Sequence, residues 1–248
     1  MSLKAKFTAE LFGTAVFIMI GICVNAMFTL FDANGTYTSI ALGWGLALMV
    51  GVYVAGAVSG AHLNPAVTIA MAVIGKMPVR DVVPYIVAQF IGAFIGAAIA
   101  FGVYYTKWLS MDIWLENTIG VFATFPAIKD SIVPGFVDQI VGTAVLLIGI
   151  LAITNQNAGD LYAKRIAPLA IGLLLATIAF SFGGLHGFAI NPARDLSPRF
   201  FAWLVGFSNT GFGDIGIWIV PVVAPVIGGV VGAVLYRYSI GCFLNKKN

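Results

Sequence analysis

Six long apolar stretches dominate this sequence and leave few folds open to it. They run roughly over residues 7–31, 37–58, 82–105, 136–154, 166–182 and 215–238. An α-helix rises about 1.5 Å per residue, so each stretch is long enough to cross a hydrocarbon layer about 30 Å thick, or nearly so. Only 9% of the 248 residues are charged, against about 25% in soluble proteins. The pattern predicts an all-α membrane protein with six transmembrane helices.

Charge and cysteine content exclude several classes of function. The net charge of +3 is too small to indicate a nucleic-acid partner. Two cysteines, Cys23 and Cys242, cannot form a disulfide framework or a thiolate metal cluster, and we interpret both as packing residues. No metal-ligand spacing occurs, and no nucleophile stands with a base and an orienting group. We therefore expect no cofactor and no metal, and an enzyme is the least expected function.

The positions of the basic residues predict an orientation in the membrane. Only Lys107 and Lys129 fall in the loops of one side, and the other side carries nine basic residues: Lys4, Lys6, Lys76, Arg80, Lys164, Arg165, Arg237, Lys246 and Lys247. Basic residues are enriched on the cytoplasmic side, so we expect a multi-pass protein of the cell membrane with both termini in the cytoplasm. The long loop from Thr106 to Val133 is then outside, with Trp108 and Trp114 expected at the membrane interface.

The chain repeats itself about halfway along its length. Residues 60–67, Gly-Ala-His-Leu-Asn-Pro-Ala-Val, resemble residues 187–194, Gly-Phe-Ala-Ile-Asn-Pro-Ala-Arg. Residues 10–14 resemble residues 139–143 at nearly the same offset, which indicates one duplication. Each half holds three spans, so the halves insert upside down relative to each other. We expect a single channel domain over residues 1–248, with repeat 1 at about 1–106, a connecting extracellular loop at about 107–133 and repeat 2 at about 134–248.

Two shorter apolar segments, 64–74 and 191–205, each begin with Asn-Pro. Asn is a favoured N-cap and Pro suits the first helical turn, so each segment is predicted to be a helix too short to span the bilayer. Inverted halves would bring the two N-termini together near the midplane, where their dipoles oppose cations and protons. The non-helical residues before each cap are predicted to line the pore with carbonyl groups: Gly60, Ala61, His62, Leu63, Gly187, Phe188, Ala189 and Ile190.

These motifs together resemble the aquaporin family (major intrinsic proteins), and more closely its glycerol-facilitator branch of bacterial type. The resemblance rests on the two Asn-Pro-Ala motifs, the Ser-Gly-Ala-His-Leu lead-in, the Asn-Pro-Ala-Arg-Asp sequence and Glu10, and it covers essentially the whole chain. It implies a right-handed bundle of six tilted helices and two half-helices, assembled as a homotetramer in the lipid membrane with one pore per subunit. It also assigns a pore role to both motifs: Asn64, Pro65, Ala66, Asn191, Pro192 and Ala193.

The resemblance further implies a four-residue selectivity filter outward of the paired Asn residues. Its members here are Trp44, Ala179, Phe188 and Arg194. Two aromatic rings opposite a guanidinium suit a polyol, which presents carbon to one side and hydroxyls to the other. Water-selective members typically have His where this chain has Ala179, so a wide pore is expected. Asp195 after the second motif also follows the polyol branch, as a structural support.

One position departs from the family pattern, and a second position is one that the pattern does not fix. Members usually have a buried Glu in both the first and the fourth span, but the partner of Glu10 is Gln139, with Asp138 beside it. The second brace is therefore expected to be weaker, or to be helped by Asp138. His186 could act as a pH-sensitive gate, but the preferred interpretation is an outer-vestibule histidine without a switching role.

The predicted function is passive diffusion of glycerol and other small neutral solutes, with water, while ions and protons are excluded. Water, hydrogen peroxide, dihydroxyacetone, urea or neutral lactic acid are alternatives as the main solute. An ion-coupled secondary transporter would need an ionisable residue on the solute path, and Glu10, the only acidic residue in the interior of a span, is expected behind a loop. A closed junctional protein is disfavoured by the small Ala179.

Overall fold

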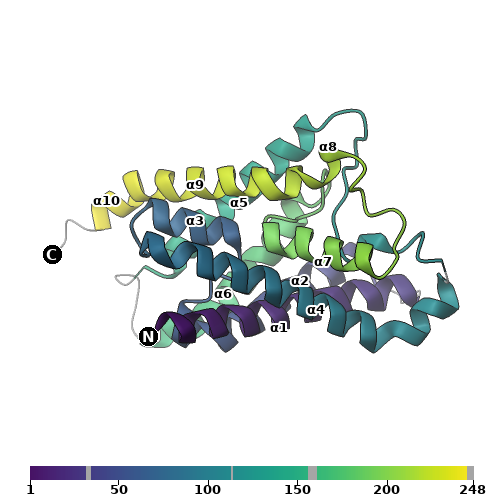
Figure 1. The fold of residues 1–248 in the computed structure, drawn as a ribbon. Coiled ribbons are helices and arrows are strands. Elements are labelled where there is room, and N and C mark those ends of the chain that lie inside the picture. Colours follow the sequence, from purple (N-terminus) through teal and green to yellow (C-terminus); the bar gives the residue numbers. More distant parts are fainter. Residues whose placement is uncertain (32–34, 113, 156–160, 245–248) are drawn as a thin grey trace.

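The computed structural model describes residues 1–31, 35–112, 114–155 and 161–244, and over these ranges every regular element is a helix (Figure 1). Six helices are long and apolar enough to cross a membrane, if the last is counted together with the short helices at its ends. Their main segments are α1 (Leu3–Leu30), α2 (Tyr37–Ser59), α4 (Val82–Met111), α5 (Val133–Ile153), α6 (Leu161–Phe182) and α9 (Val220–Tyr238). The chain is therefore an integral membrane protein of the predicted all-α class.

Two half-length helices interrupt this series at the predicted places. They are α3 (Pro65–Val73) and α7 (Pro192–Leu204), and each begins directly after the Asn of an Asn-Pro-Ala motif. The remaining elements are four short helices: η1 (Val79–Asp81), η2 (Ile119–Val121), α8 (Ile215–Trp218) and α10 (Ile240–Leu244). Figure 1 shows α3 toward the end of the bundle that holds both termini, and α7 toward the opposite end.

The two halves pack in the same way, which agrees with a duplicated chain. Helix α1 lies along α2 and α4, and its counterpart α5 lies along α6 and α9. The half-helices cross over between the halves, since α3 packs mainly on α9 and α7 packs mainly on α4. Neither half therefore completes its own packing without the other.

Glycines allow the helices of each half to approach closely. A Cβ at position 92 or 96 of α4 would overlap a backbone carbonyl of α1, and a Cβ at 228 or 232 of α9 would overlap a carbonyl of α5. Between the halves, Gly45 of α2 and Gly172 of α6 meet in the same manner. In a membrane, helices associate largely through such close packing of small residues. The spacing of four residues in both halves explains why the two repeats adopt the same geometry.

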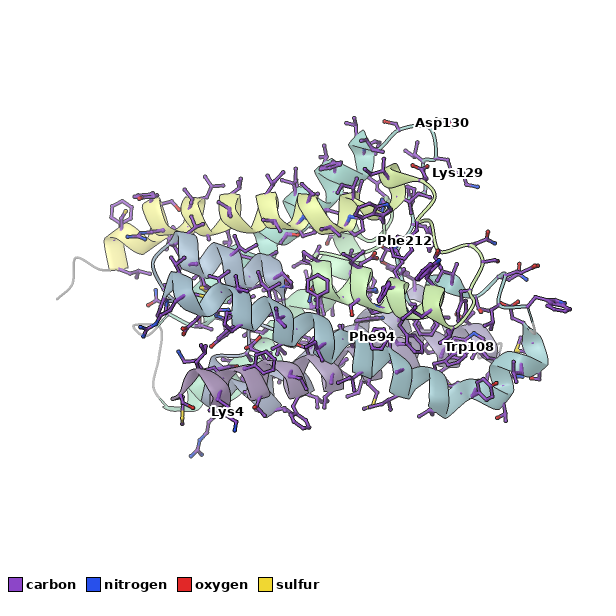
Figure 2. The ribbon with its side chains drawn as sticks, in the orientation of Figure 1. Lys4, Phe94, Trp108, Lys129, Asp130 and Phe212 are labelled. Atoms are coloured by element: carbon purple, nitrogen blue, oxygen red, sulfur yellow. The ribbon has the colours of Figure 1, made fainter. Side chains whose placement is uncertain are left out.

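The charged ends of the bundle are arranged as the orientation argument expects for the described residues. Lys4 lies at the end with the termini, and Lys129 and Asp130 lie in the loop at the opposite end (Figure 2). The remaining basic residues used for the prediction include Lys246 and Lys247, which lie outside the described residues, and Lys164, whose side chain is also outside them.

Two sequence-based expectations need correction. Helix α4 continues to Met111, so Trp108 belongs to a helix and not to a surface loop. Its indole is fully buried, stacks on Phe122 at 5.3 Å between ring centroids, and donates to Thr118 Oγ1 at 2.8 Å. The prediction that Trp108 lies at the membrane interface is therefore wrong, whereas Trp114 is 75% exposed. The predicted outer loop therefore begins after Met111 and not at Thr106, whereas the sixth predicted span runs from α8 through α9.

Candidate functional site: the meeting point of the half-helices

The two Asn-Pro-Ala motifs meet and tie the halves together. Asn64 Oδ1 caps α3 by accepting from Ala66 N at 2.9 Å, and Asn191 Oδ1 caps α7 by accepting from Ala193 N and Arg194 N. Each amide nitrogen then crosses to the other motif. Asn64 Nδ2 donates to the Ile190 carbonyl at 2.9 Å, and Asn191 Nδ2 donates to the Leu63 carbonyl at 2.8 Å. Each Asn amide has a second hydrogen, which these bonds leave available.

The segments ahead of both caps have an unusual backbone. Ala61 and Leu63 have φ near +51°, and Ile190 has φ of +40°, in the left-handed region that L-residues rarely adopt. Gly60 and Gly187 lead into these segments, also with positive φ. Residues in such conformations persist only where surrounding contacts fix them, and they concentrate at functional sites.

A cavity of about 270 Å³ runs past both segments. Its polar lining comes from the paired Asn residues, Arg194, Thr154 and the loop backbone, and its apolar lining comes from side chains of α1, α2, α3, α5 and α6. The loop residues that line it are Gly60, Ala61, His62, Leu63, Phe188, Ala189 and Ile190. Gly187 instead lines a second, outward pocket of about 330 Å³, which shares Phe188 and Arg194 with the first.

Arg194 faces two aromatic rings where the two pockets join. Its guanidinium carbon lies 4.0 Å from the Trp44 ring centroid and 5.9 Å from that of Phe188. The two rings meet edge to face at 6.2 Å. Arg194 Nη1 reaches the Phe122 carbonyl at 3.4 Å, whereas Nε is buried and finds no acceptor within the described part of the chain. Because Arg194 lines both pockets, the remaining N–H groups of its guanidinium are the donors that a solute in the cavity could reach.

Trp44 is held in place by two consecutive hydrogen bonds that the sequence motifs do not reveal. Its indole N–H donates to Asn25 Oδ1 at 2.9 Å, and Asn25 Nδ2 donates to the Val121 carbonyl at 3.0 Å. Gly21 makes room for the ring, because a Cβ there would overlap the indole. Asn25 lies one helical turn from Gly21 on α1, but nothing in the one-dimensional pattern links it to the outer loop.

Ala179, the fourth predicted filter residue, is fully buried and does not line either pocket. Tyr37, the first residue of α2, lies against it instead, with its hydroxyl 2.9 Å from the Ala179 carbonyl. The Tyr37 ring also meets the Phe188 ring edge to face at 6.2 Å. The structure thus brings Trp44, Phe188 and Arg194 together, and it places Tyr37, which the sequence motifs did not single out, against Phe188 and Ala179.

Glu10 anchors the first loop from behind. Its Oε1 accepts from His62 N at 2.9 Å and from Ser59 Oγ at 2.6 Å. Its Oε2 accepts from Leu63 N and from Gln89 Nε2, both at 2.8 Å. A fully buried carboxylate is tolerated when several donors satisfy it, as here. The His62 imidazole contacts Thr68 Oγ1 at 3.1 Å and so braces the start of α3.

Gln139 anchors the second loop through a different pattern. Its Oε1 accepts from Ile190 N at 2.7 Å, and its Nε2 donates to the Gly187 carbonyl at 2.7 Å and to Asp138 Oδ2 at 3.0 Å. Asp138 is nearly buried and also accepts from the backbone N–H of His186. A carboxylate is therefore present beside the amide, as one of the two sequence-based expectations allowed.

The outer loop is fastened to α7 by a buried ion pair. Arg199 Nη2 lies 2.8 Å from Asp195 Oδ1, and both side chains are fully buried. Asp195 Oδ2 accepts from Thr124 N and Thr124 Oγ1, and Arg199 donates to the Thr124 and Thr210 carbonyls, each at 2.7 Å. The ion pair thus supports the outer loop, whose Phe122 carbonyl accepts a hydrogen bond from Arg194.

His186 lies behind the second loop and not in the vestibule as expected, since it is 1% exposed. Its imidazole packs against Gly135 of α5, where a Cβ would come within 2.8 Å of Nδ1. Burial lowers the pKa of this imidazole, with Asp195 opposing the shift and Arg199 adding to it. The described residues contain no cluster of three His, Cys, Asp or Glu that could hold a metal ion.

Comparisons with known proteins agree with this architecture. The sequence pattern of the Major intrinsic protein family matches residues 1–236. A propanediol uptake facilitator of Citrobacter freundii is 41% identical, over 97% of this chain and 93% of its own length. The glycerol uptake facilitator protein of Escherichia coli (strain K12) is 39% identical, over 97% of this chain and 89% of its own.

A solved structure shows the same arrangement. The crystal structure of the aquaglyceroporin from Plasmodium falciparum matches with a TM-score of 0.89 and 31% identity, covering 99% of this chain and 100% of that one. Half-helices capped by paired Asn residues, a cavity past both of them and the family match over nearly the whole length lead to one conclusion. The chain belongs to the major intrinsic protein family, that of the aquaporins and glycerol facilitators.

Proposed function

We propose that this protein is a passive transmembrane channel for glycerol and other small neutral solutes, which also passes water. The observation that carries the proposal is the junction of the two pockets, where the Arg194 guanidinium faces the Trp44 and Phe188 rings. A polyol turned with its carbons to the rings and its hydroxyls to Arg194 would satisfy both sides at once. The names of the relatives, glycerol and propanediol facilitators, support the same class of solute.

Passage through the channel exchanges hydration for protein contacts. The Arg194 guanidinium lines both pockets and offers N–H donors, and the free amide hydrogens of Asn64 and Asn191 offer donors further along the cavity. The loop carbonyls of the cavity lining supply acceptors, which a hydroxyl needs because Arg and amide N–H groups only donate. Apolar side chains on the other wall accept the carbon skeleton. No step requires a chemical reaction, and no catalytic function is proposed.

Ions and protons would be excluded by the same geometry. Two helix N-termini, each with a partial positive charge, meet at the paired Asn residues, and Arg194 adds a full charge outward of them. Cations meet a positive potential and lose hydration that the narrow path does not replace. The Asn donors orient water so that a continuous proton wire is broken.

An ion-coupled transporter is less well supported. Such a mechanism needs an ionisable group that exchanges its ion on the solute path. Glu10 has four hydrogen-bond donors in place and does not line the cavity. Its carboxylate would have to abandon two loop N–H groups in order to bind a cation.

We further propose a homotetramer in the cell membrane, with both termini in the cytoplasm and residues 1–248 forming a single channel domain. The shared end of the two termini in Figure 1 and the basic residues near it support this orientation. Water, hydrogen peroxide, dihydroxyacetone and neutral lactic acid stay as alternative main solutes, because each is small and neutral enough for the same path.

The test is stopped-flow light scattering on proteoliposomes with water, glycerol, 1,2-propanediol and urea as separate gradients. We expect glycerol and propanediol permeability well above that of empty liposomes, insensitive to an uncoupler. A high water permeability, together with a glycerol permeability no greater than that of empty liposomes, would contradict the facilitator function.

A further inference from the structure

Tyr37 lies against Ala179 and Phe188, beside the constriction, although it is not among the residues that line either of the two pockets. Its hydroxyl donates to the Ala179 carbonyl at 2.9 Å, and its ring meets Phe188 edge to face at 6.2 Å. The side chain reaches from the start of α2 across to the end of α6, between residues 142 positions apart. Tyr37 is nevertheless 45% exposed, so it is not an ordinary core residue.

The Ala179 carbonyl is saturated by this contact. It accepts from Gly183 N at 3.1 Å, as the last turn of α6 requires, and from the Tyr37 hydroxyl as its second donor. A carbonyl oxygen has two lone pairs, so no acceptor is left for a solute. The Ala179 methyl group is also fully buried, whereas Tyr37, which lies against Ala179, is partly exposed.

The local sequence is shaped to hold the tyrosine there. Gly183 follows α6 directly, and a Cβ at that position would overlap the Tyr37 hydroxyl. Gly183 does not need its glycine for a positive φ, which it does not have. The space kept open at residue 183 is therefore an independent sign that the phenol is seated at this point.

The chemistry of Tyr37 complements that of Arg194. Arg194 can only donate, so a solute hydroxyl bound to it must find an acceptor for its own proton. The phenolic oxygen uses its hydrogen on Ala179 and keeps its lone pairs, and Tyr37 and Arg194 both lie near the Phe188 ring. A hydroxyl between them would accept from the guanidinium and donate to the phenol.

We propose that Tyr37 is a specificity-determining residue of the channel, which walls the constriction beside Phe188 and accepts a hydrogen bond from solute hydroxyls. This inference rests on the proposed function and deepens it. The preferred solutes are then neutral molecules with a hydroxyl that can bridge Arg194 and Tyr37. The Tyr37 ring, which is not one of the four filter positions expected from the sequence, sets an upper limit on the width of these solutes.

The experiment compares Tyr37→Phe and Tyr37→Ala with wild type in proteoliposomes, using water, glycerol and the longer polyol erythritol. Tyr37→Phe keeps the ring and loses the acceptor, so the ratio of glycerol to water permeability should fall about threefold to tenfold, the effect of one hydrogen bond. Tyr37→Ala removes the wall, so erythritol permeability should rise severalfold.

A matched control is available on the same pair of helices. Tyr53 of α2 also donates its hydroxyl to a carbonyl of α6, that of Arg165 at 3.1 Å, but near the other end of both helices. Tyr53→Phe should leave the permeability ratio unchanged. A purely structural role for Tyr37 predicts that both Phe variants lower the midpoint of thermal unfolding and that neither changes the ratio, which would overturn the proposal.

A second variant displaces the phenol without altering it. Gly183→Ala should push the Tyr37 side chain from its seat and change the permeability ratio in the same direction as Tyr37→Phe. An unchanged ratio in both variants, with wild type conducting glycerol, overturns the role of Tyr37 alone. Wild type that conducts no glycerol overturns the proposed function, and the Tyr37 proposal with it.

Discussion

The two loops that precede the half-helices are each held from behind by a buried side chain, but by different chemistry. Behind the first, the Glu10 carboxylate accepts from two backbone N–H groups, those of His62 and Leu63. Behind the second, the Gln139 amide accepts from one backbone N–H and donates to one carbonyl. A carboxylate matches a loop that presents only donors, and an amide matches one that presents a donor and an acceptor.

The second half has not lost its negative charges, but it carries them elsewhere. Asp138 stands beside Gln139, and Asp195 pairs with Arg199 on α7. This half also contains two buried arginines, whereas the first loop has only the neutral donors around Glu10. The comparison indicates that the side chain that holds the loop can be neutral when a neighbouring residue supplies the carboxylate.

The largest effect should come from breaking the clamp of the second half, the buried Asp195–Arg199 ion pair that holds the outer loop against α7. Arg199→Met leaves Asp195 charged, fully buried and without its cation, which should cost about 3–5 kcal/mol of stability. Thermal unfolding in detergent should show this as a large fall in the midpoint. Arg80→Met removes an exposed partner of Asp81 and serves as the control, with an expected cost below about 1 kcal/mol. Equal midpoints for the two variants would contradict the role of the clamp.

Glu10→Gln tests whether the first loop tolerates the amide that the second one uses. The amide oxygen can serve only part of the donor set, and its NH2 group would face the donors His62 N or Leu63 N. We expect a loss of about 2–4 kcal/mol and reduced flux. Glu116→Gln, at an exposed position, is the control. A Glu10→Gln protein as stable as wild type would mean that the two braces are interchangeable.

Gln139→Glu tests the comparison in the opposite direction. The new carboxylate would lie about 3 Å from Asp138 and would lose the bond to the Gly187 carbonyl, so we expect a cost of about 2 kcal/mol near neutral pH. Adding Asp138→Asn should restore much of this loss. A double-mutant cycle that is additive within about 0.5 kcal/mol would show that the two positions are not coupled.

The smallest effect concerns His186, which has no counterpart in the first loop. Its pKa in the folded protein lies below the ordinary value of 6.5, because burial disfavours the imidazolium. The unfolded chain therefore binds the proton more readily, and stability should fall as the pH drops below about 6.5. His186→Gln should reduce the difference in unfolding midpoint between pH 7.5 and pH 5 by about 1–2 °C. An unchanged difference would exclude this histidine as its source.

Much of the fold could be predicted from the sequence, because long apolar runs and Asn-Pro caps have local meanings. The starts of α3 and α7 were predicted to the residue, since Asn64 and Asn191 act as N-caps through their own side chains. The far end of α4 was missed by six residues, because Trp108 and its neighbours read equally well as an interfacial loop. The packing of Trp108 on Phe122, which is a tertiary contact, decides between a helix and a loop at this point.

The constriction was only partly predictable for the same reason. Trp44, Phe188 and Arg194 are placed by their spacing from the Asn-Pro-Ala motifs, whose geometry is rigid. Tyr37 lies 142 residues from the carbonyl to which it donates, and no local pattern joins the two. The sequence shows that Gln139 replaces the usual Glu of the family. It does not show that the Gly187 carbonyl lies where the Gln139 amide can donate to it.

The crossed packing of the half-helices has a consequence for how the chain is made. Helix α3 emerges early from the ribosome, yet it packs mainly on α9, one of the last helices to be synthesised. The Asn64 amide lacks its acceptor until Ile190 has been made, and α3 lacks its main packing partner until α9 follows. This short apolar helix can therefore complete its contacts only after nearly the whole chain has been synthesised. A chain that stops before α9 lacks the helix on which α3 mainly packs, so it cannot complete the bundle.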